Sequence, residues 1–284
     1  MSAFASHFAF EFRTGIRNKN LLLMNYLFPL GLYLMMSVIM PGVNPLFQAV
    51  IIPGMVTFGI LASTLLGLPD PLVNAREAGI FRSYKINGVP AINILLIPAL
   101  STIMHILVVT LIILITAPLF FDAPAPQNYA TFFLTVLGMA VACTGLAILI
   151  GVIAPNSRLT ILFSQAIFLP SMIIGGIMIP FSMLPGAAAK VALLLPATHT
   201  MNALNGLAMG GRADFYPWGS ILTLFVGGIT AFMLAWYLFR WDSSSSERRG
   251  HPLMALLALV PYAAWLLVKL PGAMHSLSLI HPKF

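Results

Sequence analysis

The sequence predicts an all-α polytopic membrane protein. Its residues are 60% hydrophobic and only 7% charged, whereas about 25% of the residues in a typical soluble domain are charged. Several runs of about 20 residues contain no charged side chain, which is long enough to cross a hydrocarbon layer about 30 Å thick. The short alternating segments of a membrane β-barrel are absent. The chain therefore has too few polar side chains to cover a soluble fold.

The first 20 residues predict an interfacial helix. Phe4, Phe8, Phe12 and Ile16 recur at a spacing of four, which places them on one face of a helix. Basic residues follow towards the end of this segment. This pattern is typical of a helix that lies in the membrane interface rather than one that crosses the bilayer. A disordered N-terminal tail is the alternative.

Six crossing segments are expected after this helix. They fall at about 21–40, 48–68, 91–117, 129–153, 159–179 and 218–239. Small residues at a spacing of four, such as Gly138 with Ala142 and Ala147 with Gly151, indicate close helix contacts. Such contacts can form within one subunit or between two subunits.

The basic residues on the connections predict the orientation of the chain. Those on one side are Arg13, Arg17, Lys19, Arg76, Arg82, Lys85, Arg158, Arg240, Arg248 and Arg249. Only Lys190 and Arg212 fall on the other side before residue 250. The positive-inside rule therefore predicts a multi-pass protein of the cell inner membrane with its N-terminus in the cytoplasm. The net charge of +7 lies in short clusters beside the spans, which favours membrane lipid over nucleic acid as a partner.

The segment 74–90, NAREAGIFRSYKINGVP, concentrates charge between two apolar runs. It predicts a short cytoplasmic helix that Asn74 caps, with Glu77 completing a capping box and Gly88 and Pro90 marking the end. A small apolar face would consist of Ile80, Phe81 and Tyr84. Such a helix could dock on a partner protein, and a solvated loop is the alternative.

Two later segments are too apolar to be ordinary solvent-exposed loops. The proline-rich and apolar stretch 180–212 predicts a re-entrant helical hairpin on the outer side, because its apolar pieces are too short to span. Residues 246–284 form a polar linker and an additional C-terminal hydrophobic helix at 252–271. We favour a seventh crossing for this helix, and a position on the membrane surface is the alternative.

Two stretches resemble the membrane subunits of type-2 ABC exporters. REAGIFRSYKINGVP is similar to the coupling helix of that family in its Arg-Glu pair, glycine and final proline. Residues 169–207 are similar to its fifth span and re-entrant hairpin at Pro170, Gly176, Pro180, Leu184, Pro185, Pro196, Thr198 and Ala203. The likeness covers residues 1–245 as one transmembrane domain. The chain departs from the family at Ala75, where Glu is frequent, and at Asn205, where Arg is frequent.

The resemblance implies the permease subunit of an ATP-driven exporter that works by alternating access. The chain has no G-x-x-x-x-G-K-[ST] phosphate loop, so we expect no enzyme activity and no cofactor of its own. ATP and Mg would be bound by a separate ABC ATPase subunit. This partner would dock on the coupling helix through Arg76, Glu77, Ile80, Phe81, Arg82, Tyr84 and Gly88. Because six crossings are few for a substrate path, we also expect a second permease copy, either identical or paralogous.

Polar residues within the apolar segments are candidates for the substrate path. They are His105, Gln165, Thr198, His199, Asn202 and Asn205. The alternative for a lone neutral His or Gln is a hydrogen bond to a neighbouring helix. We expect no metal site, because the hairpin has no second His or carboxylate at ligand spacing.

The largely uncharged path favours an apolar or amphipathic substrate such as a drug or a lipid-like molecule. A glycan or another polar cargo is the alternative. An ion-driven secondary transporter would be expected to carry charged residues within its spans, and the six core segments show none. A membrane-embedded enzyme would need a clustered acid, base or metal site.

Overall fold

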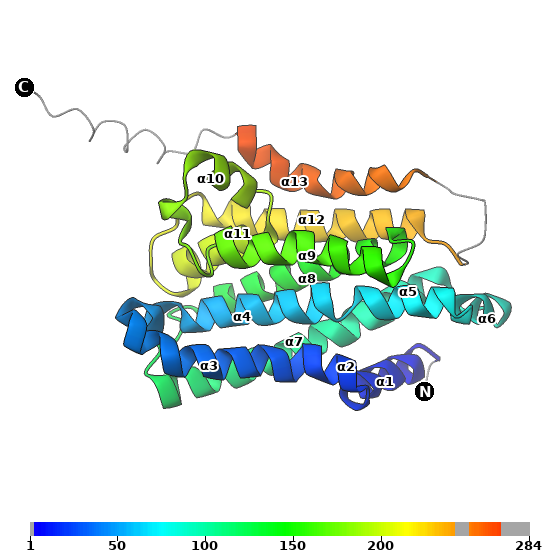
Figure 1. Ribbon diagram of the computed structural model, residues 1–284, viewed down its shortest axis with the longest axis horizontal. Coiled ribbons are helices and arrows are strands. Elements are labelled where there is room, and N and C mark those ends of the chain that lie inside the picture. The colour runs from blue at the N-terminus through cyan, green and yellow to red at the C-terminus, as the bar shows by residue number, and fades with distance from the viewer. Residues whose placement is uncertain (1–2, 242–249, 268–284) are drawn as a thin grey trace, which may run out of the picture.

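The computed structural model describes residues 3–241 and 250–267, and in these ranges it contains helices and no strands. Six helical segments of the described chain are long and apolar enough to cross a membrane. They are Lys19–Val43, Phe47–Glu77, Ala91–Phe121, Tyr129–Ile153, Ser157–Ile174 and Pro217–Leu238. The long helices run along a common axis (Figure 1). The predicted all-α polytopic fold is therefore confirmed.

The first two spans are each interrupted by a π-helical turn. The first consists of α2 (Lys19–Leu22), a π turn and α3 (Phe28–Val43). The second consists of α4 (Ile51–Leu61), a π turn and α5 (Pro69–Glu77), and a short 3-10 helix precedes it. A π turn inserts an extra residue into a helix and is frequent at functional sites. These two turns pack against each other.

The remaining four spans are α7 (Ala91–Phe121), α8 (Tyr129–Ile153), α9 (Ser157–Ile174) and α12 (Pro217–Leu238). The side chains of Asn128 and Asn156 accept hydrogen bonds from main-chain N–H groups at the starts of α8 and α9, as expected of N-cap residues. The helix α9 ends earlier than the predicted bound of 179. Gly175 follows it, and Gly176 then adopts a φ of +90° that turns the chain away.

The centre of the bundle is occupied by the second and fourth spans, whereas the first and fifth lie at its periphery. The helices α8 and α12 make the most extensive contact. Two of the small residues singled out in the sequence serve such contacts within this chain: Gly138 faces Phe225 of α12, and Gly151 faces Leu72 of α5. At these two positions the structure supports packing within one subunit.

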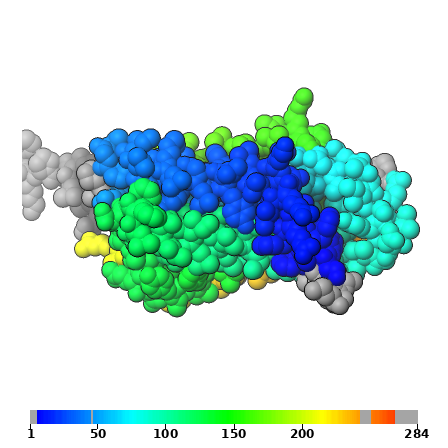
Figure 2. Space-filling model, turned by 90° about the horizontal axis from the view of Figure 1, so that it is seen from below, coloured from blue at the N-terminus to red at the C-terminus, as the bar shows by residue number. Residues whose placement is uncertain are grey.

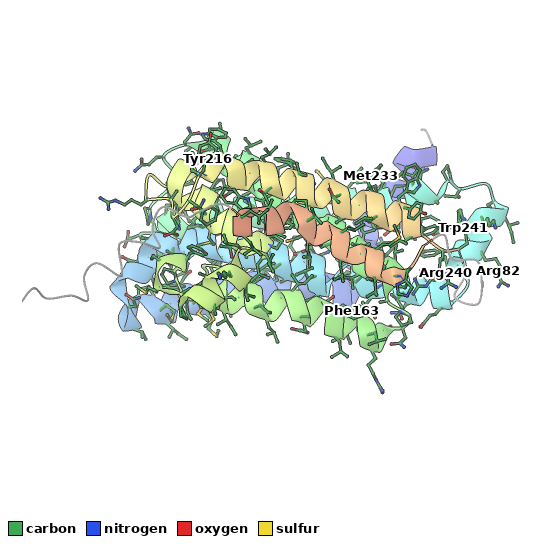
Figure 3. The ribbon with its side chains drawn as sticks, turned by 90° about the horizontal axis from the view of Figure 1, so that it is seen from above. Arg82, Phe163, Tyr216, Met233, Arg240 and Trp241 are labelled. Carbon is green, nitrogen blue, oxygen red and sulfur yellow. The ribbon has the colours of Figure 1, made fainter. Side chains whose placement is uncertain are left out.

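A helical hairpin, α10 (Gly186–Ala192) and α11 (Pro196–Ala203), lies at the end of the bundle opposite α6 (Ile80–Ile86) (Figure 1). In Figure 3, Arg82 and Arg240 lie at the α6 end and Tyr216 lies at the other. Connections that the charge pattern places on one side thus meet at the α6 end.

The C-terminal apolar segment packs against α12. It consists of a 3-10 helix (Pro252–Leu259), α13 (Val260–Ala263) and a further 3-10 turn (Ala264–Leu267). Trp265 donates a hydrogen bond from Nε1 to Oγ1 of Thr223 over 2.8 Å. Most of the linker and residues 268–271 of the predicted helix lie outside the described residues.

Candidate functional site

The charged segment 74–90 forms two elements rather than one helix. The helix α5 ends at Glu77, and Gly79 adopts a φ of +74°, a left-handed conformation that favours glycine. The short helix α6 (Ile80–Ile86) follows, and Gly88 adopts a similar φ of +73°. The chain therefore makes a sharp corner in the middle of the predicted coupling helix.

The prediction that Asn74 begins a helix is wrong. Asn74 lies inside α5, because the apolar run before it continues as helix through the buried Leu72 and Val73. Its side chain instead donates to Oδ2 of Asp70 over 2.8 Å and accepts from Oγ of Ser157 over 2.9 Å. Asn74 thereby links α5 to the start of α9.

Arg76 points into the bundle and is only 6% exposed. Its guanidinium donates to the main-chain carbonyl of Val152 over 2.7 Å, and also to those of Gly151 and Ala154. These carbonyls lie at the C-terminal end of α8, where main-chain acceptors lack partners within the helix and a positive charge is favourable. Arg76 thus fastens α5 to the end of α8 instead of facing a partner.

Phe81 is likewise buried, at 5% exposed, and its ring lies 5.6 Å from that of Phe239, directly after α12. Tyr84 is half-buried, with its ring 5.8 Å from the ring of His7 in α1 (Ala3–Arg17). The apolar face predicted for docking therefore packs mainly inward. It attaches α6 to α12 and α1.

The outer surface of this element consists of other side chains. Of the seven predicted docking residues, Glu77, Ile80, Arg82 and Gly88 are exposed. Ile86 is 79% exposed on α6 and was missed in the sequence. The residues three and four positions before it are Ser83 and Arg82, so no apolar residue precedes it on its own face of α6, and this was the available signal. The outer surface of α6 is formed by Arg82 and Ile86.

The helix α1 packs along α7 and lies near α5 and α6 (Figure 2). Phe12 turns into the bundle and stacks on His105 of α7, with ring centroids 4.4 Å apart. Ile16 is exposed, as is Phe10, while the side chain of Phe4 is not described. Only part of the predicted apolar face is therefore available to the membrane.

The close contact of α1 with α7 depends on Gly15, because a Cβ at this position would overlap Nε2 of His105. We expect Gly15→Val to displace α1 from α7 and to accelerate tryptic cleavage at Arg13 and Arg17 severalfold. Limited proteolysis in detergent measures this. Gly42→Val is the matched control, because a Cβ there meets nothing within 4 Å. Equal cleavage of both variants would show that the contact does not hold α1.

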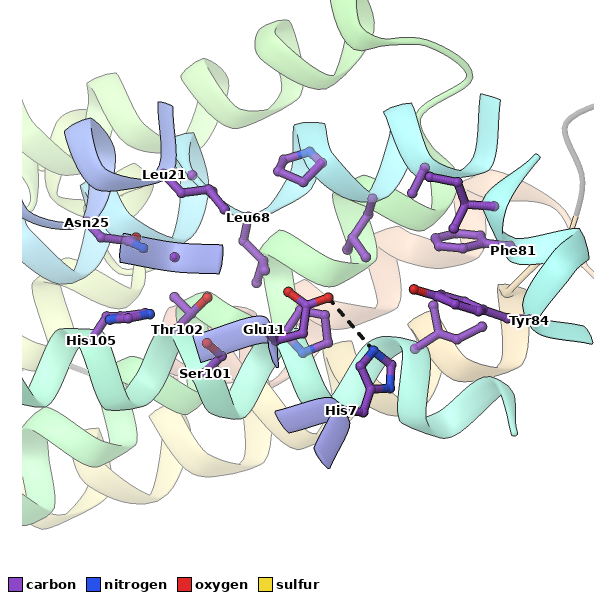
Figure 4. Close-up of a pocket in the computed structure, with 18 residues that line it drawn as sticks. His7, Glu11, Leu21, Asn25, Leu68, Phe81, Tyr84, Ser101, Thr102 and His105 are labelled. Atoms are coloured by element: carbon purple, nitrogen blue, oxygen red, sulfur yellow. Dashed lines mark ion pairs between the residues drawn. The ribbon is translucent and has the colours of Figure 1, made fainter. Parts of the chain in front are cut away.

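A cavity of about 200 Å³ lies between α1, α5, α6 and α7 (Figure 4). Glu11 and His7 of α1 face it and form an ion pair over 3.9 Å when the histidine is protonated. Burial raises the pKa of Glu11, and the nearby His7 opposes this shift. Burial and the charge of Glu11 also raise the pKa of Tyr84. An acidic side chain of α1 is thus directed inward.

His105 is the one predicted substrate-path residue on this cavity. It is buried, and its Nδ1 lies 2.6 Å from the hydroxyl of Tyr26 in the first π turn. Asn25 of the same turn also lines the cavity, as does Gly67 directly after the second π turn. Both irregular turns therefore border the same space.

The other candidates for the substrate path lie elsewhere. Gln165 is half-buried in α9, and Thr198, His199, Asn202 and Asn205 lie in the hairpin. The carboxamide of Asn202 bonds Phe215, Ser220 and Asp214, so it ties the hairpin to α12. Burial lowers the pKa of His199 to about 4, while its bond to the carbonyl of Leu193 opposes this shift. The structure thus gives these two residues internal partners, and their role in transport stays a prediction.

A bundle of six apolar spans, with a bent charged element at one end and a helical hairpin at the other, defines a polytopic membrane domain. A family model described as "ABC-2 type transporter" matches residues 3–208, and the chain belongs to this family. The family model describes the membrane component of such transporters. ABC transporter G family member 20 of Dictyostelium discoideum is 24% identical over 198 residues, which is 69% of this chain. The chain covers 26% of that relative's length. No solved structure matches this chain.

Proposed function

We propose that this chain is the permease subunit of an ATP-driven exporter, with the α6 end facing the cytoplasm of a cell whose inner membrane it crosses. The N-terminus then lies on the cytoplasmic side, as the distribution of basic residues predicts. A separate ATPase subunit binds ATP and Mg²⁺ and docks on the outer surface of α6. Conformational changes of this subunit open the path alternately to the two sides.

The observation that carries this proposal is the attachment of the α5–α6 corner to several spans. Arg76 bonds the end of α8, and Phe81 contacts the residue that follows α12. A force applied to α6 is therefore transmitted to the central helices. Shifting a two-state equilibrium from 1:99 to 99:1 requires about 5.5 kcal/mol of differential binding. ATP binding can supply this only if the docked element differs in position between the two states.

The substrate in this proposal is apolar or amphipathic, such as a drug or a lipid-like molecule, and a second permease copy completes its path. The peripheral helix α9 leaves Ile161, Leu162, Leu169 and Ile173 exposed, and this apolar face suits lipid as well as a second copy. Export of a glycan is the alternative.

We further propose that the C-terminal segment crosses the membrane. Most of its residues are in 3-10 conformation, which rises about 2.0 Å per residue, so 16 residues extend about 30 Å. Its start contacts the end of α12 at Leu238 through Gly250, and Trp265 contacts the beginning of α12 at Gly219. The segment therefore runs antiparallel to α12 over its length.

Docking is tested by co-expressing the chain with its ATPase and purifying the complex from detergent. We expect Ile86→Asp to abolish co-purification of the ATPase, because a charge replaces an exposed apolar contact at the docking surface. The matched control is Met183→Asp at the opposite end of the bundle, where the side chain is 74% exposed. Retention of the ATPase by Ile86→Asp would place docking elsewhere. Loss with both variants would indicate a general effect of the added charge.

A further inference from the structure

The cavity at the α6 end combines an acidic group with a mixed polar and apolar wall. Glu11 faces it from α1, and Ser101, Thr102 and His105 face it from α7 (Figure 4). Apolar side chains of Leu21, Leu68 and Leu72 complete the wall. A small number of polar groups in an apolar pocket is typical of a site for a small organic molecule.

The charged residues that line the cavity determine which charge a ligand should carry. No Lys or Arg of the described chain lines it, and Glu11 is its one acidic residue in that part of the chain. The ion pair of Glu11 with His7 is long, at 3.9 Å, and exists only while the histidine is protonated. A cationic N–H group can therefore donate a charge-assisted hydrogen bond to the carboxylate. An anion would find a positive partner among these residues only in His7, and only while that histidine is protonated.

Three small residues, Gly15, Gly67 and Ala75, belong to the wall of the cavity. The hydroxyl of Tyr84 is directed towards Glu11 (Figure 4), so it can accept a further hydrogen bond from a donor bound there. Aromatic faces such as that of Tyr84 also attract cations. The volume of about 200 Å³ admits the head group and part of the chain of an alkylamine.

We propose that this cavity binds the protonated amine of an amphipathic molecule, with the carboxylate of Glu11 as its counter-ion and hydrogen-bond acceptor. That such a molecule is the transported substrate rests on the proposed function. Ile80, Phe81 and Tyr84 of α6 belong to the cavity wall, so the bound amine contacts the element on which the ATPase docks. Loading of the cavity is thereby coupled to the position of α6.

The test is binding of radiolabelled n-octylamine to the purified full chain in phosphatidylcholine nanodiscs. The amine is protonated at pH 7, as a lysine side chain with a pKa of about 10.4 is, and n-octanol is the uncharged probe of equal length. We expect saturable amine binding that Glu11→Gln weakens by roughly tenfold or more. The control is Asp122→Asn, which removes an exposed carboxylate at the other end of the bundle and suits the left-handed backbone there.

A second variant keeps the carboxylate of Glu11 and reduces the volume of the cavity. Ala75→Leu should reduce octylamine binding as strongly as Glu11→Gln, provided that both proteins elute as folded species on size exclusion. Equal amine binding by wild type and Glu11→Gln would overturn the proposal, and so would octanol binding of equal strength. The assay contains no ATPase, so its outcome is independent of the docking experiment.

Discussion

A Gly228→Val variant is expected to lose the folded bundle. Gly228 lies where α12 meets α8, and a Cβ there would come within 2.6 Å of the carbonyl carbon of Val141. The facing Gly145 is equally constrained, because its Cβ would overlap the carbonyl oxygen of Gly228. Overpacking a core usually costs about 1–3 kcal/mol. We expect a larger loss here, because the overlap is with the main chain and no rotamer can relieve it.

The yield of monodisperse protein after membrane extraction and size exclusion measures this effect. The matched control is Gly31→Val in α3, where a Cβ meets nothing within 4 Å. We expect the control to behave as wild type and Gly228→Val to aggregate. Normal yield and thermal stability of Gly228→Val would mean that α8 and α12 are farther apart than described.

Replacing Arg76 is expected to cause the second large loss of stability. Arg76→Met keeps a long side chain but removes the donors to Gly151, Val152 and Ala154. Each buried carbonyl left without a partner costs about 1–3 kcal/mol. We therefore expect the variant to be destabilised by about 3 kcal/mol or more, which thermal unfolding in detergent would report as a markedly lower Tm.

Arg82→Met separates this effect from the loss of one positive charge. Arg82 is an exposed neighbour on α6, and an interaction made by an exposed charged side chain contributes at most about 1 kcal/mol, so its replacement should change the Tm little. We also expect Arg76→Met to impair coupling in protein that remains folded, because α5 is then no longer fastened to α8. A Tm of Arg76→Met equal to that of Arg82→Met would contradict the anchoring role.

The sequence predicted the spans well where a long uncharged run coincides with a helix. The segment 129–153 agrees with α8 at both ends, because hydropathy and the cap at Asn128 act locally. The charged segment 74–90 was predicted less well. The partners of Arg76 are main-chain carbonyls 75 to 78 residues away. Every residue has such a carbonyl, so no sequence pattern indicates which ones an arginine will reach.

The sequence also did not predict that the side chain of Glu11 points into the bundle. On the helix α1, Glu11 follows His7 at a spacing of four and precedes Gly15 by four, so the three residues share one face. The phenylalanine repeat suggested that another face would be buried. The stacking of Phe12 on His105 and the close approach at Gly15 decided how the helix is rotated.

The sequence by itself determined the fold class, the six spans, the end at which basic residues gather and the resemblance to the ABC exporter family. These depend on the transfer of side chains from water to lipid, which is a property of each segment alone. Only the tertiary structure decided that Arg76 and Phe81 face inward, that Ile86 faces outward and that a cavity forms around Glu11. Those features depend on contacts between residues that are distant in the chain, and their partners exist only after the helices have packed.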